Sequence, residues 1–281
     1  EQQTGEKEVN AAGYCLGGTL LATTLAYLAA KRQKRIASAT FFTTMTDFTD
    51  PGELGVFIDE GQVSSLEKKM FERGYLEGSE MAGTFSMLRA NDLIWSFVVN
   101  NYLLGKDPFP FDLLYWNSDS TRMPATMHSF YLRNMYMENR LIEPGGIEID
   151  GTPIDLTKIK VPCYFISAIE DLIAPWKSTY MGARRFTAPV RFVLGGSGHI
   201  AGIVNPPAQQ KYGYWDRAGD ELPEAADAWL ERATQHPGSW WPDWQRWITS
   251  LDAEQVAARD PVAGPLGVIE EAPGRYVLVR A

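Results

Sequence analysis

A pentapeptide near the start of the chain constrains the fold more than any other feature. Residues 13–17, Gly-Tyr-Cys-Leu-Gly, have the G-x-S-x-G spacing of a nucleophile elbow, with Cys15 in the place of serine. Residues 8–14 before the turn are typical of a strand, and residues 19–30 after it predict a helix. A strand that turns sharply into a helix indicates an α/β fold built on a parallel sheet.

The elbow gives Cys15 a specific chemistry. Gly13 and Gly17 are expected to be small so that strand and helix can approach each other. A side chain at this joint lies beside a helix N-terminus, whose partial positive charge favours thiolate over thiol. The backbone N–H of Leu16 would point toward a developing oxyanion. The alternative is that the pattern arose by chance and Cys15 is a small buried hydrophobe, and the pentapeptide alone does not separate the two.

The rest of the chain repeats the signals of a parallel sheet after a long interruption. Residues 36–44, 161–168 and 190–194 are apolar runs typical of buried strands. Residues 47–155 lose this rhythm, with helical stretches and Pro-rich connections, and are interpreted as an inserted cap. We therefore predict an α/β-hydrolase fold with a mostly parallel sheet, a core of residues 1–46 and 156–281, and a cap subdomain of residues 47–155. The Trp-rich residues 222–251 are predicted to be helical and to pack on the sheet.

An acid and a histidine follow the two late strands, in the order that this fold requires after its nucleophile. Asp171 follows strand 161–168, and His199 lies in a Gly-rich loop after strand 190–194. Glu170 competes for the role of the acid. The chain has three histidines, and the other two, His128 in the predicted cap and His236 before Pro-Gly, are expected to be structural or exposed. The residues alone therefore give Cys15, His199 and either Asp171 or Glu170 as the candidate catalytic set.

Two further residues have the chemistry of a catalytic group but a weaker position. Asp47 follows the second predicted strand and is expected to be a turn or cap residue, and Cys163 lies within an apolar strand and is expected to be inert.

Charge and cysteine content exclude several classes of partner. The net charge of −9, with 35 acidic and 26 basic residues, argues against a nucleic-acid surface, and a small anionic ligand would need a local basic pocket. Two cysteines in 281 residues favour a reducing compartment, so the cytoplasm is expected. The longest apolar stretch, residues 16–30, is too short to span a bilayer, and no transmembrane segment is expected.

Several longer motifs together resemble the polyhydroxyalkanoate synthases. The match extends over nearly the whole chain, and its motifs are residues 13–19 (GYCLGGT), 91–95 (NDLIW), 110–117 (PFDLLYWN), 191–202 (RFVLGGSGHIAG), 236–244 (HPGSWWPDW) and 272–277 (APGRYV). Among these enzymes the chain most resembles the single-subunit type that favours short-chain substrates.

The resemblance implies an acyltransferase that polymerises (R)-3-hydroxyacyl-CoA thioesters into a polyester and releases coenzyme A. Cys15 would carry the growing chain as a thioester, His199 would activate it, and Asp171 would either orient His199 or help to deprotonate the incoming hydroxyl. Coenzyme A is then part of the substrate and a released product, so no cofactor and no metal are expected. The resemblance also implies a homodimer at the surface of polyester granules.

The same resemblance implies that earlier core strands, with the loop that supplies a second oxyanion donor, precede the elbow in the family; these strands are expected to be missing from the present sequence. Two other functions remain open from the residues. One is a cysteine-dependent hydrolase or acyltransferase of the same fold, similar to dienelactone hydrolases, and the other is a noncatalytic granule-coating protein. An intact set of Cys15, Asp171 and His199 argues against the second.

Overall fold

The structure is a computed structural model that describes residues 1–88, 90–108, 119, 121–219, 221–260 and 262–279. The chain divides into two compact units. The first contains residues 1–55 and 134–267, and the second contains residues 56–133 and 268–281. The 110–117 motif of the sequence lies outside the described residues.

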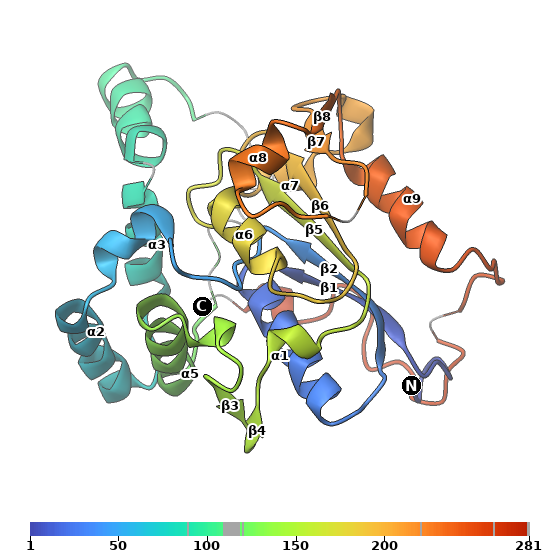
Figure 1. The fold of residues 1–281 in the computed structure, drawn as a ribbon. Coiled ribbons are helices and arrows are strands. Elements are labelled where there is room, and N and C mark those ends of the chain that lie inside the picture. Colours follow the sequence, from blue (N-terminus) through green and yellow to red (C-terminus); the bar gives the residue numbers. More distant parts are fainter. Residues whose placement is uncertain (89, 109–118, 120, 220, 261, 280–281) are drawn as a thin grey trace. The chain divides into compact units, whose positions relative to one another are not determined.

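A six-stranded sheet, with strand order β1-β2-β5-β6-β7-β8, forms the centre of the first unit (Figure 1). Neighbouring strands from β1 to β6 pair in parallel, and β7 and β8 then add antiparallel. The mostly parallel sheet of the sequence prediction is confirmed. Its strands are β1 (Val9–Tyr14), β2 (Ile36–Phe42), β5 (Cys163–Ala168), β6 (Val190–Gly195), β7 (Tyr214–Asp216) and β8 (Thr234–His236).

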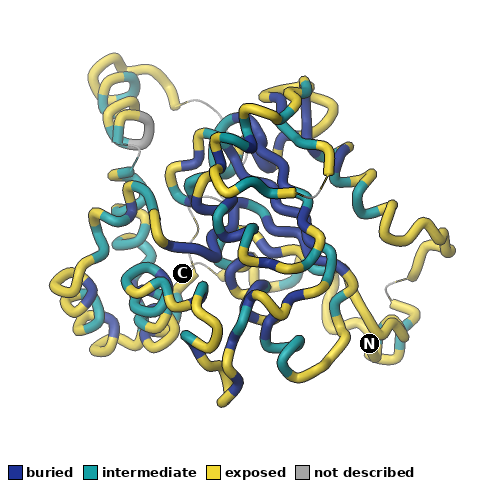
Figure 2. The backbone as a smooth tube through the Cα atoms, in the orientation of Figure 1, coloured by how far each residue is buried: buried dark blue, intermediate teal, exposed yellow. Residues whose placement is uncertain are grey.

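Alternating side chains of the strands form two aromatic layers, because successive residues of a strand point to opposite faces. On one face Phe165 stacks on Phe41 with ring centroids 4.4 Å apart, and Phe192 packs edge-on at 5.0 Å against Trp229 of helix α8 (Ala226–Leu230). On the other face Tyr164 belongs to a buried cluster with Trp240. Figure 2 shows that the buried backbone of this unit follows the strands.

Helices of the first unit connect the strands and cover the sheet. They are α1 (Leu16–Ala30), α6 (Trp176–Ala183), α7 (Ala201–Val204), α8 (Ala226–Leu230) and α9 (Trp241–Leu251). A small hairpin of β3 (Glu148–Ile149) and β4 (Thr152–Pro153) precedes β5, and short 3-10 turns occur at Gly52–Phe57, Arg140–Ile142, Leu156–Lys158 and Pro207–Gln209.

The prediction of a helical segment over residues 222–251 is wrong in its middle part. Strand β8 separates α8 from α9 and extends the sheet by pairing with β7. Gly238, with φ +78°, follows β8 and turns the chain toward α9. The expected packing on the sheet is confirmed, because Trp240, Trp244 and Trp247 contact the buried cluster of the second face.

Helices joined by turns and loops make up the second unit over its described residues. It contains α2 (Glu60–Arg73), α3 (Gly78–Leu88), the π-helices η2 (Asn91–Trp95) and η3 (Val98–Leu103), α5 (Ala125–Tyr131), and the 3-10 turn η8 (Tyr276–Leu278). A π-helix, η4 (Leu132–Met137), continues the chain from α5 across the unit boundary.

Local sequence explains the limits of α2. The Asp59 carboxylate accepts a hydrogen bond from the Gln62 N–H at 2.9 Å, which caps the helix. Gly74 ends the helix in the left-handed conformation with φ +88°.

The predicted insertion and the second unit have different limits. The predicted insertion spans residues 47–155, whereas residues 47–55 and 134–155 belong to the same unit as the sheet. Its role as a cap stays a prediction.

Two features are absent from the described residues. None of their helices combines the length and the apolar character needed to cross a membrane. Within the same part of the chain, no three His, Cys, Asp or Glu side chains are grouped so as to hold a metal ion.

Candidate active site

Cys15 occupies the sharp turn between β1 and α1, and its backbone is strained. Its φ of 51° and ψ of −119° place a residue with a side chain in a region that normally only glycine adopts. Backbone hydrogen bonds hold this conformation: the Cys15 N–H donates to the Phe42 carbonyl at 2.8 Å, and the Cys15 carbonyl accepts from Gly18 N–H at 2.9 Å. Leu16 is the first residue of α1, so its N–H has no acceptor within the helix.

The glycines around Cys15 have different reasons to be glycine. A Cβ on Gly13 would lie 2.6 Å from the Gly17 carbonyl oxygen, as expected from the close approach of strand and helix. A Cβ on Gly17 would meet nothing within 4 Å, so the expected steric reason does not apply there. The third glycine, Gly18, is the crowded one, because its Cβ would lie 1.8 Å from Thr44 Oγ1.

The carboxyl edge of the sheet brings His199 and Asp171 together. Asp171 follows β5 and His199 follows β6, and these strands are parallel neighbours. The His199 Nδ1 lies 2.7 Å from Asp171 Oδ2, and the two side chains are 14% and 0% exposed. The other carboxylate oxygen of Asp171 accepts hydrogen bonds from the N–H groups of Ile173 at 2.8 Å and Ala174 at 2.9 Å. Every acceptor atom of this buried carboxylate is therefore in use.

Electrostatics link His199 to both other members of the candidate set. Burial lowers the pKa of His199, but hydrogen bonds with Asp171 and Cys15 outweigh it and raise that pKa to about 9. The Cys15 side chain is partly exposed and close enough to the imidazole to contribute to this shift. The structure thus places the three predicted residues at one site.

Tyr14 is a site residue that the sequence reasoning missed. Its hydroxyl donates a hydrogen bond to the backbone carbonyl of His199. Its ring packs edge-on against the His199 imidazole, with centroids 5.5 Å apart, and against Phe42 at 5.9 Å. Burial, together with the nearby charges of Asp171 and Cys15, raises the pKa of the phenol, so it stays neutral. Its place beside Cys15 in the pentapeptide was the one available signal.

Glu170, His128 and His236 were the other candidates for the acid and the histidine, and the structure gives them other surroundings. Glu170 is exposed, and the His199 ring is bonded to Asp171 instead. His128 is buried in α5 of the second unit, and burial lowers its pKa. His236 lies in β8, where its Nε2 is 2.7 Å from Asp216 Oδ1.

Asp47 and Cys163 are both buried, in surroundings that suit structural roles. Asp47 is buried and binds Arg185 Nη2 at 3.0 Å and Asn139 Nδ2 at 3.0 Å. Although burial opposes it, these hydrogen bonds and those from Thr49 lower the pKa of Asp47. Cys163 lies in β5 without exposed surface, and burial raises the pKa of its thiol.

The arrangement suits transfer of an acyl group through sulfur. A thiol on a strained turn, a histidine within reach, and a buried carboxylate that fixes the imidazole are the three parts of a nucleophilic triad. An N–H at the helix start can stabilise an oxyanion.

Comparison with known proteins places the fold. The family model of the alpha/beta hydrolase fold matches residues 1–206. The chain belongs to the alpha/beta hydrolase fold family. As a member of this family it has an esterase from Exiguobacterium antarcticum among its structural neighbours, aligned over 69% of this chain and 61% of the esterase chain, with a TM-score of 0.36 and 14% identity.

Curated relatives of this alpha/beta hydrolase are named poly(3-hydroxyalkanoate) polymerases, which confirms the resemblance seen in the sequence. The polymerase subunit of Rhizobium meliloti is 57% identical over 100% of this chain and 45% of its own length. The subunit of Rhizobium etli is 54% identical over 100% of this chain and 44% of its own. The subunit of Cupriavidus necator is 44% identical over 99% of this chain and 48% of its own. The chain spans about half the length of the curated relatives it matches.

Proposed function

We propose that this chain carries the catalytic site of an acyltransferase that polymerises (R)-3-hydroxyacyl-CoA thioesters into a polyester. One observation carries the proposal: a cysteine stands at the strained elbow, with His199 and Asp171 at the same site. The chain is also homologous over its whole length to proteins named poly(3-hydroxyalkanoate) polymerases. No resident cofactor or metal takes part in the proposed reaction.

The first step would load an acyl group onto Cys15. His199 accepts the proton of the thiol, and the sulfur attacks the carbonyl carbon of the CoA thioester. The Leu16 N–H stabilises the resulting oxyanion. The C–S bond to coenzyme A then breaks, the CoA sulfur takes up the proton from His199, and the acyl group remains on Cys15 as a thioester.

The second step would extend the polyester. A hydroxyl group attacks the Cys15 thioester while its proton passes to a base, a new oxoester forms, and the Cys15 sulfur leaves. The occupied carboxylate of Asp171, with one oxygen on His199 and the other on two backbone N–H groups, supports an orienting role for this residue and leaves His199 as the base.

Sulfur suits this reaction sequence because it conserves the energy of the substrate. Exchange of an acyl group between the thiols of coenzyme A and Cys15 is nearly thermoneutral, whereas transfer to a serine would form an oxoester before any polymer bond is made. Formation of the polymer oxoester from the Cys15 thioester is then downhill.

The decisive experiment incubates the protein with 3-hydroxybutyryl-CoA and follows thiol release and polymer together. Both products are expected with the wild type, and neither with Cys15→Ala. Cys163→Ala is the matched control and should keep activity, since that thiol is buried in β5. Thiol release with only monomeric acid would contradict polymerisation and indicate a hydrolase. Substrate consumption by Cys15→Ala would remove Cys15 as the nucleophile.

The proposal extends to the surroundings in which such an enzyme works. We propose a homodimer in the cytoplasm that binds to the surface of the polyester granule it makes. Sedimentation measurements on the purified protein test the dimer, and a fluorescent fusion protein in polyester-forming cells tests the granule. A monomer at working concentrations, or diffuse fluorescence, would contradict the corresponding part.

A further inference from the structure

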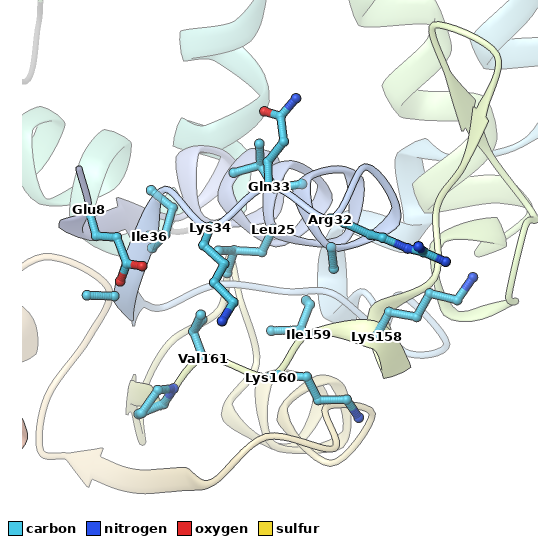
Figure 3. Close-up of a pocket in the computed structure, with 14 residues that line it drawn as sticks. Glu8, Leu25, Arg32, Gln33, Lys34, Ile36, Lys158, Ile159, Lys160 and Val161 are labelled. Atoms are coloured by element: carbon cyan, nitrogen blue, oxygen red, sulfur yellow. The ribbon is translucent and has the colours of Figure 1, made fainter. Parts of the chain in front are cut away.

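A pocket of about 510 Å³ lies in the first unit at the amino end of the parallel strands (Figure 3). Its wall is formed by the end of α1, by the loop before β2, and by the segment that leads into β5. A pocket of this size is within the range of small-molecule sites.

The rim of the pocket is basic in a chain that is acidic as a whole. Figure 3 shows Arg32 and Lys34 on the loop after α1, and Lys158 and Lys160 on the segment before β5. One carboxylate, that of Glu8, also contributes to the lining. Four cations and one anion thus surround a space in a protein whose net charge is −9. Because distant exposed charges are screened by salt, this local excess dominates the field felt by a ligand in the pocket.

The four cations are not equally free. Lys160 donates to Thr187 Oγ1, and Lys158 Nζ lies 3.8 Å from an oxygen of Asp155. Arg32 and Lys34 are exposed, and no hydrogen bond or ion pair joins their side chains to the part of the chain that the structure describes. They are the two cations available to an incoming anion, and a guanidinium can hold a phosphate or carboxylate through two parallel hydrogen bonds.

The floor of the pocket is apolar. Leu25 and Leu28 of α1 contribute to it, together with Ile159 and Val161 of the segment before β5. Hydrocarbon placed against such a floor leaves water at a gain of free energy proportional to the area covered. The pocket therefore combines an apolar surface with free cations at its edge.

The candidate catalytic residues lie at the other end of the same strands. Cys15 and Asp171 follow β1 and β5, whereas Glu8 precedes β1 and Lys160 precedes β5. Each of these strands has six residues, which is about 20 Å at 3.3 Å per residue. The pocket is thus separate from the site proposed for acyl transfer.

We propose that this pocket binds an anionic amphiphile, with a phosphate or carboxylate headgroup at the basic rim, where Arg32 and Lys34 each offer a free cation, and a hydrocarbon tail against the apolar lining from α1. The headgroup can belong to a free single-chain amphiphile or to a lipid in a surface. The inference goes beyond the proposed acyl transfer and does not depend on it.

Calorimetric titration with decyl phosphate below its micellar concentration, compared with inorganic phosphate, tests the two halves of the pocket. Because only decyl phosphate reaches the floor, it should bind at least about tenfold more tightly. Flotation with vesicles of phosphatidylcholine, with and without phosphatidylglycerol, tests the lipid source. Binding of free decyl phosphate identifies a soluble ligand, and binding only to the anionic vesicles identifies a lipid headgroup. Absence of both, or equal affinities for the two phosphates, overturns the proposal.

Variants then assign the binding to this pocket. Arg32→Gln with Lys34→Gln should weaken binding by about tenfold or more, whereas the control Arg232→Gln, also exposed, should not. An acyl-CoA site could also accept an amphiphile, so Cys15→Ala serves as the control for binding at that site. It should bind like the wild type, because the pocket lies at the other end of the strands. Unchanged affinity in the double variant, or loss of binding in Cys15→Ala, contradicts the assignment. Since Arg32 and Lys34 are remote from Cys15, thiol release should persist in the double variant, so failure of one proposal is distinguishable from failure of the other.

Discussion

At the scale of single residues, the conformation of Cys15 is the feature that most favours catalysis over packing. A side chain with positive φ costs about 1–3 kcal/mol and persists only when the surroundings hold it. Bonds from Cys15 to Phe42 and Gly18 supply that support. A cysteine kept only for packing would not need a strained turn, whereas a nucleophile gains from standing clear of the sheet.

Replacement of Asp171 by Asn should remove the charged partner that orients the His199 ring and raises its pKa. The carboxylate is the first of the partners that raise the pKa of His199 to about 9, so the variant's pKa should fall toward the ordinary 6.5. We expect thiol release to slow by about 100-fold or more, because the imidazole loses its orientation. NMR titration of the three histidines measures the pKa directly, with His236 as an internal control. An unchanged His199 titration would contradict the link.

The raised pKa of His199 also predicts how stability depends on pH. A group whose folded pKa exceeds its unfolded value stabilises the protein fully below the unfolded pKa and loses that effect as pH rises through the folded one. For His199 this interval runs from 6.5 to about 9. The free energy of unfolding of the wild type should therefore exceed that of His199→Gln by less at the upper end of this interval than at the lower end. Urea denaturation measures both free energies. A difference that stays constant with pH would contradict the assignment.

The variant Tyr14→Phe tests the contribution of the Tyr14 hydroxyl separately from that of the ring. The variant keeps the ring contacts with His199 and Phe42 but loses the hydrogen bond to the His199 carbonyl. A typical hydrogen bond contributes about 1 kcal/mol, so kcat should fall by about fivefold with little change in KM. Tyr14→Leu, which also loses the ring, should be slower still. Equal kcat in Tyr14→Phe and wild type would mean that the hydroxyl does not position His199.

At the scale of elements, the junction of β1 and α1 depends on Gly18 more than on Gly17. A Cβ on Gly18 would overlap Thr44, whereas one on Gly17 meets open space. Gly18→Ala is therefore expected to destabilise the protein by about 1–3 kcal/mol. Gly17→Ala should be neutral or stabilising by up to about 1 kcal/mol, since alanine favours the helix. Urea denaturation of both variants measures the difference, and equal stabilities would show that the junction relaxes around Gly18.

The elements that were predicted correctly are those with strong local signals. β2, β5 and β6 are apolar runs bounded by turn residues, and a buried parallel strand needs little more to be recognised. β1 is mostly exposed and was recognised together with the elbow that follows it. β7 and β8 were missed because each has three residues and is held by long-range pairing to β6 rather than by its own pattern.

At the scale of the whole molecule, the order of site residues was predictable and their surroundings were not. Cys15, Asp171 and His199 each follow a strand, and parallel strands carry their carboxyl ends to one edge. The contact of Tyr14 with His199 joins residues 185 positions apart, and no local sequence pattern predicts such a contact. The limits of the two units depend on contacts between distant segments, which no local sequence pattern reveals.

A buried ionic network joins the late part of the first unit to the sheet. Arg191 of β6 binds Asp243 of α9 through Nε at 2.8 Å and Nη2 at 2.6 Å, and Asp216 of β7 through Nη2 at 2.6 Å. The Tyr164 hydroxyl donates to the same Asp243 carboxylate at 3.0 Å. Burial works to raise the pKa of Asp243, but the hydrogen bonds from Arg191 outweigh it and lower that pKa.

Arg191→Met should destabilise the whole first unit, because it leaves the Asp243 carboxylate, 4% exposed, without its main partner. Loss of one partner of a buried ion pair costs about 3–5 kcal/mol, which urea denaturation at neutral pH measures. Arg246→Met removes another cation from the same carboxylate, but this arginine is 67% exposed, so its loss should cost less than about 1 kcal/mol.

The stability of Arg191→Met and Arg246→Met at acidic pH tests whether the Asp243 charge causes the destabilisation. In the wild type, the lowered pKa of Asp243 gives stability that is present above its ordinary value of 3.8 and lost as pH falls through the lowered one. In Arg191→Met, only the Tyr164 hydroxyl and Arg246 still oppose the effect of burial, so the pKa of Asp243 should rise, and the carboxyl takes up a proton at higher pH and no longer leaves a poorly paired charge in the interior. The deficit of Arg191→Met relative to the wild type should therefore shrink on acidification, while Arg246→Met stays close to the wild type. A deficit that is independent of pH would assign the loss to packing of the Arg191 stem.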